Sequence, residues 1–369
     1  MSKNIFIYNP MLITKKKLQD LPGIRAFRQA FNLFNENVVL IDRTHTIQVP
    51  VNVAVHAPIP EFRKIDKSYE QICDERAQEL LRRSDEHDLP INVFYSGGID
   101  STLVMVSLLK NATEEQKNRI CAFMSQESIN ENPAFYRDHL RGKVKLEAAA
   151  VYPYALSKRA LFVGGEYNDQ IFGSALFKDF LDVHGEEALA KKYSRNQMAQ
   201  MFGRKWHNDA VISWYMDLFE KVRAAAPCPV ESNADFLWWI NFSLKWQSVY
   251  FRMLTYASDF VVHNIDRDFI DNYFFHFYGT DDFQLWSMGN PDKRVVTKWE
   301  SYKQEAKDVI YRFNKDSDYR DFKTKNGSLA WVIMHQIQKN FIDDQMHMYM
   351  TLPRTDWFNP NNSFKDAPF

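Results

Sequence analysis

Cysteines and long apolar runs are scarce in this 369-residue chain. It has only three cysteines, Cys73, Cys121 and Cys228, which lie far apart and form no Cys-x-x-Cys pair. That spacing excludes a zinc-ribbon or dithiol redox motif and is typical of a protein in a reducing compartment. No run approaches about 18 uncharged apolar residues, and the N-terminus lacks the apolar core of a signal peptide. The sequence therefore predicts a cytoplasmic protein with no membrane span.

An excess of charge of either sign is also missing. The chain has 46 Lys and Arg against 47 Asp and Glu, a formal net charge of -1. Proteins that bind nucleic acid through their overall field are strongly basic, so nucleic acid is not an expected partner, although a local basic groove stays open. Aromatic residues are abundant, and we assign them to a helical core rather than to a platform for stacking bases.

The pattern of apolar residues divides the chain into three stretches. Residues 1–60 contain short β-branched and aromatic runs, which predict a small β-rich region, with residues 56–68 as the linker. From residue 61 to about residue 185, apolar strand-like runs alternate with helix-like runs, and helical spacing dominates from there to residue 369. The predicted fold class is α/β: a parallel sheet flanked by helices in a domain of residues 61–369, with a mainly helical C-terminal half.

A loop with two glycines lies between a buried strand-like run and an apolar helix-like run. Glycines permit a tight turn whose backbone N–H groups can approach an anion, and the start of the helix adds a positive dipole. Asp100 would repel a phosphate directly, but a carboxylate there suits a Mg²⁺ ion that also binds phosphates. The pattern predicts a polyphosphate site formed by Ser96, Gly97, Gly98, Ile99, Asp100 and Ser101.

The segment FYSGGIDST resembles the signature of the N-type ATP pyrophosphatases, which include GMP, NAD, argininosuccinate and asparagine synthetases. The GxxxxGK[ST] loop of the enzymes that transfer a γ-phosphate is absent. The resemblance implies the PP-loop fold, which is adenine nucleotide α-hydrolase-like. It also implies that ATP and Mg²⁺ are the cofactors and that the β- and γ-phosphates leave together as pyrophosphate.

A second glycine turn, residues 164–173, resembles the SGEGxDExFGG segment of asparagine synthetase and β-lactam synthetase. In that branch the aspartate shares the Mg²⁺ with the aspartate of the first loop, which implies a metal site formed by Asp100 and Asp169. The glutamate lies near the reacting acyl group and amine, which implies that role for Glu166. Gly165 stands where the family has glycine and is expected to line the nucleotide site.

Lysines in the C-terminal half match the same branch more loosely. SYKQEAKDVIYR resembles the family's KxxLR helix and places Lys303 and Lys307 in its basic positions. YRDFKTKNGS resembles a stretch in which a lysine faces the α-phosphate, which implies Lys323 first and Lys325 second. A lysine alone is more often a solvated surface charge, and only the order of these motifs along residues 68–330 supports the role.

The chain also departs from the family. Asparagine synthetase begins with a glutaminase domain whose nucleophile is an N-terminal cysteine, whereas Ser2 and a short N-terminal region stand here. In the second turn, Tyr167 replaces a glycine and Gln170 replaces a glutamate. We therefore expect ammonia, another amine or a separate glutaminase chain as the nitrogen source.

The expected activity is that of an ATP-dependent ligase. It adenylates a small-molecule carboxylate, releases pyrophosphate and forms an amide. Two alternatives stay open: a PP-loop enzyme that adenylates a nucleobase carbonyl for nitrogen or sulfur insertion, and a non-catalytic synthetase-like subunit. The sequence specifies neither the acid and amine nor the oligomeric state.

Overall fold

A computed structural model describes residues 41–47, 54–173, 176–257, 260–294, 299–323 and 360–361. These residues form two compact units. The sheet unit contains Ser68–Glu166, Tyr256–Gly279 and the described residues from Glu305 onward. The helical unit contains Tyr167–Thr255, Thr280–Gln304 and the described residues up to Lys67. The chain therefore leaves the sheet unit within the second glycine turn, after Glu166, and returns to it at Tyr256.

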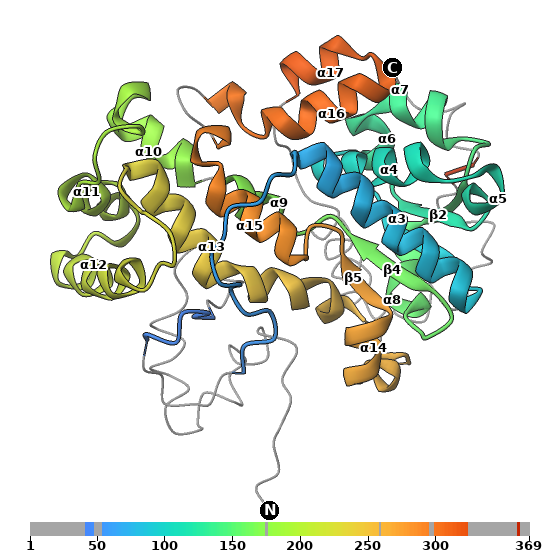
Figure 1. The fold of residues 1–369 in the computed structure, drawn as a ribbon, viewed down its shortest axis with the longest axis horizontal. Helices are drawn as coiled ribbons and strands as arrows, with labels where there is room; N and C mark the ends of the chain where they lie inside the picture. The colour runs from blue at the N-terminus through green and yellow to red at the C-terminus, as the bar shows by residue number, and fades with distance from the viewer. Residues whose placement is uncertain are drawn as a thin grey trace, which may run out of the picture. The chain divides into compact units, whose positions relative to one another are not determined.

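The sheet unit is built on a five-stranded parallel sheet, in the order β3-β2-β1-β4-β5. Figure 1 shows the neighbouring strands β4 and β5. Every pair of neighbouring strands is parallel, with Val93 of β1 opposite Ala122 of β2 on one side and Val163 of β4 on the other. Buried apolar strands of this kind require helical crossovers. The predicted α/β class is confirmed. The strands are β1 (Ile91–Phe94), β2 (Ile120–Met124), β3 (Lys145–Ala148), β4 (Leu161–Gly164) and β5 (Phe274–His276).

Strand β5 is absent from the sequence-based prediction, which described the chain beyond about residue 185 as mainly helical. It pairs with β4 at the sheet edge, with Phe275 opposite Val163 and His276 opposite Gly164. A run of three residues is too short to show a strand period, and the parallel neighbour that orders it is more than 100 positions earlier in the sequence. The prediction of a mainly helical C-terminal half therefore omits this one strand.

Helices of the sheet unit agree with the alternating pattern around the strands. Asn132 caps α7 by accepting a hydrogen bond from the Phe135 N–H, with Pro133 at the first helical position. The helical segments are α3 (Tyr69–His87), α4 (Ile99–Asn111), α5 (Glu114–Lys117), α6 (Gln126–Glu131), α7 (Pro133–Phe135), η2 (Tyr136–Leu140), η3 (Ala149–Val151), α8 (Tyr152–Ala155), η6 (Val262–Asn264), α14 (Arg267–Asn272), α16 (Gln304–Asn314) and α17 (Ser317–Phe322).

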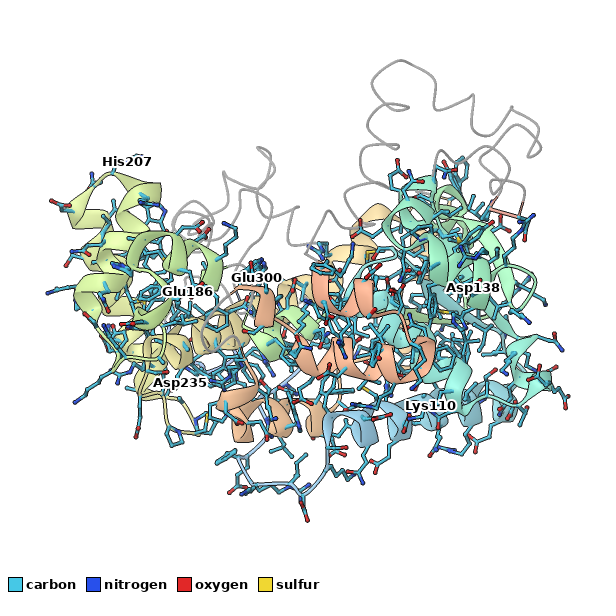
Figure 2. All side chains as sticks on the ribbon, turned by 90° about the horizontal axis from the view of Figure 1, so that it is seen from above. Lys110, Asp138, Glu186, His207, Asp235 and Glu300 are labelled. Atoms are coloured by element: carbon cyan, nitrogen blue, oxygen red, sulfur yellow. The ribbon has the colours of Figure 1, made fainter. Side chains whose placement is uncertain are left out.

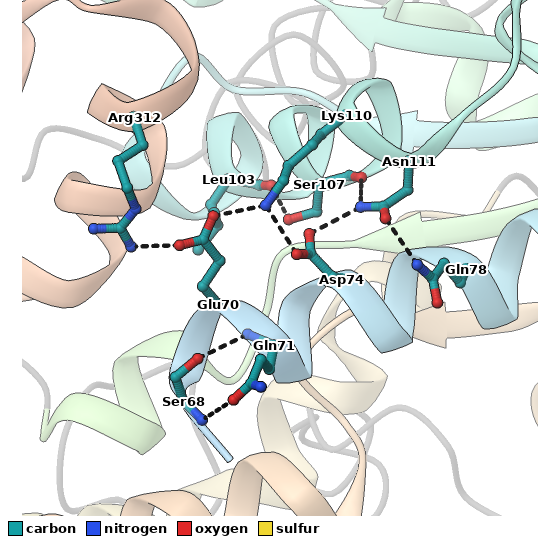
Figure 3. Close-up of polar contacts among 10 residues, drawn as sticks. All are labelled: Ser68, Glu70, Gln71, Asp74, Gln78, Leu103, Ser107, Lys110, Asn111 and Arg312. Atoms are coloured by element: carbon teal, nitrogen blue, oxygen red, sulfur yellow. Dashed lines mark hydrogen bonds and ion pairs between the residues drawn. The ribbon is translucent and has the colours of Figure 1, made fainter.

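A polar network joins α3 to α4 and α16 (Figure 3). Lys110 of α4 donates to Glu70 at 2.6 Å and to Asp74 at 2.8 Å, and Arg312 of α16 pairs with Glu70 at 2.8 Å. Ser68 caps α3 in a capping box with Gln71. Ion pairs this exposed contribute little each, so the buried apolar face of α3 is the main source of its packing energy.

The helical unit buries several large aromatic rings. Trp238, Trp239 and Trp246 of α13 are fully buried, which agrees with the predicted aromatic core. Asp235, which is labelled in Figure 2, lies in the first turn of α13 and forms an ion pair at 2.6 Å with the buried Arg294. The segments are α9 (Asn168–Phe172), α10 (Leu176–His184), η4 (Glu186–Ala188), α11 (Arg195–Trp206), α12 (Asp209–Ala224), α13 (Asn233–Arg252), η5 (Met253–Tyr256), α15 (Asp281–Gly289), η7 (Pro291–Lys293) and η8 (Trp299–Ser301).

Most of the predicted β-rich region, residues 1–60, lies outside the described residues, and so do residues 324–359 and 362–369 of the half predicted to be mainly helical. Within residues 41–47 and 54–60 no strand is present. Arg43 is buried there and donates to the carbonyls of Ala57 and Phe242 at 2.7 and 2.9 Å. Across the described part of the chain, no helix has the length and apolar character needed to cross a membrane.

Candidate nucleotide site

The predicted phosphate loop lies where β1 ends and α4 begins, at the carboxyl edge of the parallel sheet. Gly98 is the N-cap of α4, and the Thr102 N–H donates to its carbonyl at 3.0 Å. The first backbone N–H groups of a helix have no partner within it, and the helix dipole makes this end positive. A strand, a glycine turn and a helix start therefore provide an arrangement suited to an anion.

The two serines of the loop hold its ends together. The Ser96 N–H donates to Ser101 Oγ at 3.0 Å, and the two hydroxyl oxygens lie 3.0 Å apart. Ser96 Oγ also accepts from the Gly98 N–H at 3.3 Å. These hydrogen bonds join the start of the loop to its end. In this structure the serine hydroxyls therefore stabilise the turn itself. Ile99 is buried beneath it, and Asp100 is half-buried in the first turn of α4.

Gly97 is the position where only glycine fits. Its φ is +76°, and an added Cβ would lie 2.3 Å from the Ser128 carbonyl oxygen and 2.8 Å from the Glu131 Cβ. Helix α6, which follows β2, therefore packs directly on the loop. Both the backbone angle and the close neighbour select glycine here.

The second glycine turn meets the first at the same sheet edge. A Cβ on Gly165 would lie 3.2 Å from the Ser101 nitrogen and 3.3 Å from the Asp100 carbonyl carbon. Gly164, one position earlier, has His276 Nδ1 2.7 Å from its own Cβ position. Glu166 follows directly and is half-buried. The structure thus brings together Gly165 and the loop, as the resemblance implied.

Two tyrosine hydroxyls hold the loop carbonyls. Tyr319 of α17 donates to the Gly97 carbonyl at 3.1 Å and lies 3.3 Å from the Thr102 hydroxyl. Tyr278, just after β5, donates to the Asp100 carbonyl at 2.8 Å. Burial raises the pKa of both phenols well above the usual value, and the negative charge of Asp100 adds to this. The phenols therefore keep their protons and act as donors at neutral pH.

Lys323 lies close to the loop but is paired with a carboxylate. It follows α17 directly, and its ammonium group forms an ion pair with Glu131 of α6. Both side chains are largely buried, with 9% and 15% of their surfaces exposed. Glu131 is also the residue whose Cβ packs on Gly97. Among the predicted lysines, Lys323 is therefore connected to the loop through its ion pair with Glu131. Lys325 lies outside the described residues.

Asp169 and Lys303 belong to the helical unit and contact each other. Lys303 Nζ pairs with Asp169 Oδ1 at 2.7 Å, and the Tyr302 hydroxyl donates to the same oxygen at 2.7 Å. Lys303 is buried and has a φ of +58°, a left-handed conformation that is uncommon for a side-chain-bearing residue. The structure joins these two predicted site residues in an ion pair that the motifs did not indicate.

The described residues differ in how well they fit a Mg²⁺ ion. No group of three or more His, Cys, Asp or Glu side chains in the described part of the chain could hold a metal. A magnesium ion on a nucleotide needs only one or two carboxylates, because phosphates and water complete its shell. Asp100, beside the glycine loop, fits that requirement. Asp169 fits it less well, because an ammonium group already neutralises its charge, and the shared site of the two aspartates stays a prediction.

Three residues around the loop were missed by the sequence analysis: Glu131, Tyr278 and Tyr319. Tyr319 begins the segment YRDFKTKNGS, in which the resemblance assigns roles to lysines but none to the tyrosine. Tyr278 follows the strand that was not predicted. A long-range contact of this kind leaves no periodic signal near either partner.

A scan against models of protein families finds no match for this chain, and a search of curated proteins finds no relative.

Proposed function

We propose that the protein is an ATP-dependent ligase that adenylates a carboxylate, releases pyrophosphate and forms an amide with ammonia or another amine. The observation that carries the proposal is the loop from Ser96 to Ser101, held between β1 and α4 with Gly165 packed against it. Its glycines, helix start and donor hydroxyls suit the β- and γ-phosphates of ATP. The resemblance to the asparagine synthetase branch supplies the reaction class.

In the proposed reaction a carboxylate oxygen of the substrate attacks the α-phosphorus of ATP. The bond from that phosphorus to the bridging oxygen breaks, and pyrophosphate leaves with the electron pair. The amine then attacks the acyl carbon, AMP leaves, and an amide forms after the nitrogen loses a proton. Glu166, next to Gly165, is the proposed acceptor of that proton.

Lys323 is the proposed cation for the α-phosphate, because it is the predicted lysine with a described connection to the loop through Glu131. A positive group held there would stabilise charge that develops on the phosphoryl oxygens. A bound Mg²⁺ would supply further charge neutralisation, with Asp100 as the protein ligand on the loop. Lys303 is a weaker candidate, since it belongs to the helical unit and its ion-pair partner is Asp169 rather than a residue that packs on the loop.

The test is a pyrophosphate-release screen across carboxylic acids with ammonia or amines. Asp100→Ala is expected to abolish release, and Lys323→Ala to lower it by orders of magnitude, on the order of 10²–10³. Asp138→Ala is the matched control, because Asp138 is an exposed aspartate of the same unit paired with Arg137. Release at the wild-type rate by Asp100→Ala would contradict the role of this carboxylate.

One observation favours a second candidate, a synthetase-like subunit that binds a nucleotide without catalysis. Asp169, which the family uses for the metal, is engaged by Lys303 and Tyr302. A protein that binds ATP by calorimetry but releases no pyrophosphate with any acid and amine would fit this candidate. Pyrophosphate release above the control would exclude it.

A further inference from the structure

Glu131 stands out because a carboxylate beside a phosphate loop opposes the binding of an anion. Its Cβ and Cγ would lie 2.8 and 3.2 Å from a Cβ built on Gly97. Its charge also helps to raise the pKa of Tyr319, the phenol that donates to the Gly97 carbonyl, although burial is the larger cause. The negative charge is therefore close enough to act on whatever binds the loop.

The partner of Glu131 is the cation that the proposed reaction needs. Lys323 Nζ forms an ion pair with Glu131 Oε1, and neither side chain is more than 15% exposed. An ammonium group held by a carboxylate is electrostatically almost neutral to a third charge at a distance. A polyphosphate at the loop must therefore share Lys323 with Glu131.

We infer that Glu131 is a specificity-determining residue of the loop: it competes with polyphosphate for Lys323 and weakens the binding of metal-free polyphosphate. A metal-free polyphosphate carries the most negative charge and feels the repulsion most. A polyphosphate whose charge is partly neutralised feels it less. This inference rests on the proposed nucleotide site, because it names the residue that sets which charge state the site accepts.

The experiment is calorimetry of inorganic pyrophosphate in EDTA with the full chain. Glu131→Gln is expected to tighten binding by about fivefold or more, because one nearby negative charge is removed while shape is kept. Glu131→Asp keeps the charge and should remain near the wild-type affinity. Glu115→Gln is the matched control, because Glu115 is exposed on α5. Helix α5 precedes β2 and so lies toward the amino-terminal ends of the strands, whereas the loop lies at their carboxyl ends. Glu115→Gln should change the affinity by less than about twofold.

A second titration with Mg²⁺ present tests the selectivity directly. The gain from Glu131→Gln should be smaller there than in EDTA. If the wild type binds pyrophosphate and Glu131→Gln binds it equally or more weakly, this inference is overturned. The proposed nucleotide site is not contradicted by that result. If Glu131→Gln raises the affinity for pyrophosphate equally with and without Mg²⁺, Glu131 does not discriminate between metal-free and metal-bound polyphosphate. If neither wild type nor Glu131→Gln binds pyrophosphate, both this inference and the proposed function are overturned.

Discussion

Gly97 shows how a single residue can be fixed by two independent constraints. A positive φ disfavours any side chain, and the carbonyl oxygen of Ser128 occupies the space where a Cβ would stand. Gly142 has a similar φ of +70°, but nothing lies within 4 Å of its Cβ position. A comparison of Gly97 with Gly142 therefore distinguishes the cost of a positive φ from the cost of a steric clash.

We predict that Gly97→Ala lowers the free energy of unfolding by about 2 kcal/mol or more, against about 1 kcal/mol for Gly142→Ala. The larger loss reflects a clash with backbone that has little room to move. Urea unfolding of both variants measures the difference. Equal losses would show that α6 can move away from the loop without cost.

At the scale of elements, α17 is a short helix attached to the loop by one phenol. Tyr319 is buried, and its hydroxyl reaches both Gly97 and Thr102. Because this donor occupies the Gly97 carbonyl, the carbonyl is less available to turn toward a bound anion. The helix therefore influences the loop geometry without contributing a charge from this residue.

Tyr319→Phe is expected to weaken pyrophosphate binding about threefold to tenfold and to cost about 1 kcal/mol of stability, since one buried acceptor loses its donor. Tyr136→Phe is the control, because that phenol is also buried but donates to the Pro360 carbonyl. Calorimetry and urea unfolding together separate the two effects. A loss of stability without a loss of binding would assign Tyr319 a purely structural role.

The elements that sequence could predict are those with a local signal. The helix from Tyr69, the strands β1 to β4 and the loop between β1 and α4 follow from apolar runs, turn residues and Asn132 as a cap. Strand β5 could not be predicted, because its order comes from pairing with β4. The ion pairs of Glu131 with Lys323 and of Asp169 with Lys303 depend on the same kind of distant contact.

At the scale of the molecule, all three thiols are held in their neutral form. Burial raises the pKa of Cys228 to about 11 and that of Cys121 to about 12, from an ordinary value of 9.0. Burial also raises the pKa of Cys73 well above that value. Cys73 and Cys121 belong to the sheet unit and Cys228 to the helical unit, so both units carry this property.

These shifts predict that stability falls as the pH rises above about 9. In the unfolded chain the thiols lose their protons near pH 9, whereas in the folded protein they keep them, so alkali favours unfolding. We expect the free energy of unfolding to drop by about 4 kcal/mol between pH 8 and pH 10, or about 1.4 kcal/mol for each thiol, measured by urea unfolding. A variant with all three cysteines changed to alanine should show a shallower slope, and an identical slope would assign the effect to other groups.

The two phenols that hold the loop come from far along the chain: Tyr278 is 178 positions after Asp100, and Tyr319 is 222 positions after Gly97. During synthesis, the ribosome therefore produces the glycine turn long before the donors for its carbonyls. A nascent chain that stops after β4 contains the complete loop from Ser96 to Ser101. It still lacks the two tyrosine hydroxyls that donate hydrogen bonds to the carbonyls of that loop. Competence to bind an anion should thus arise late in translation.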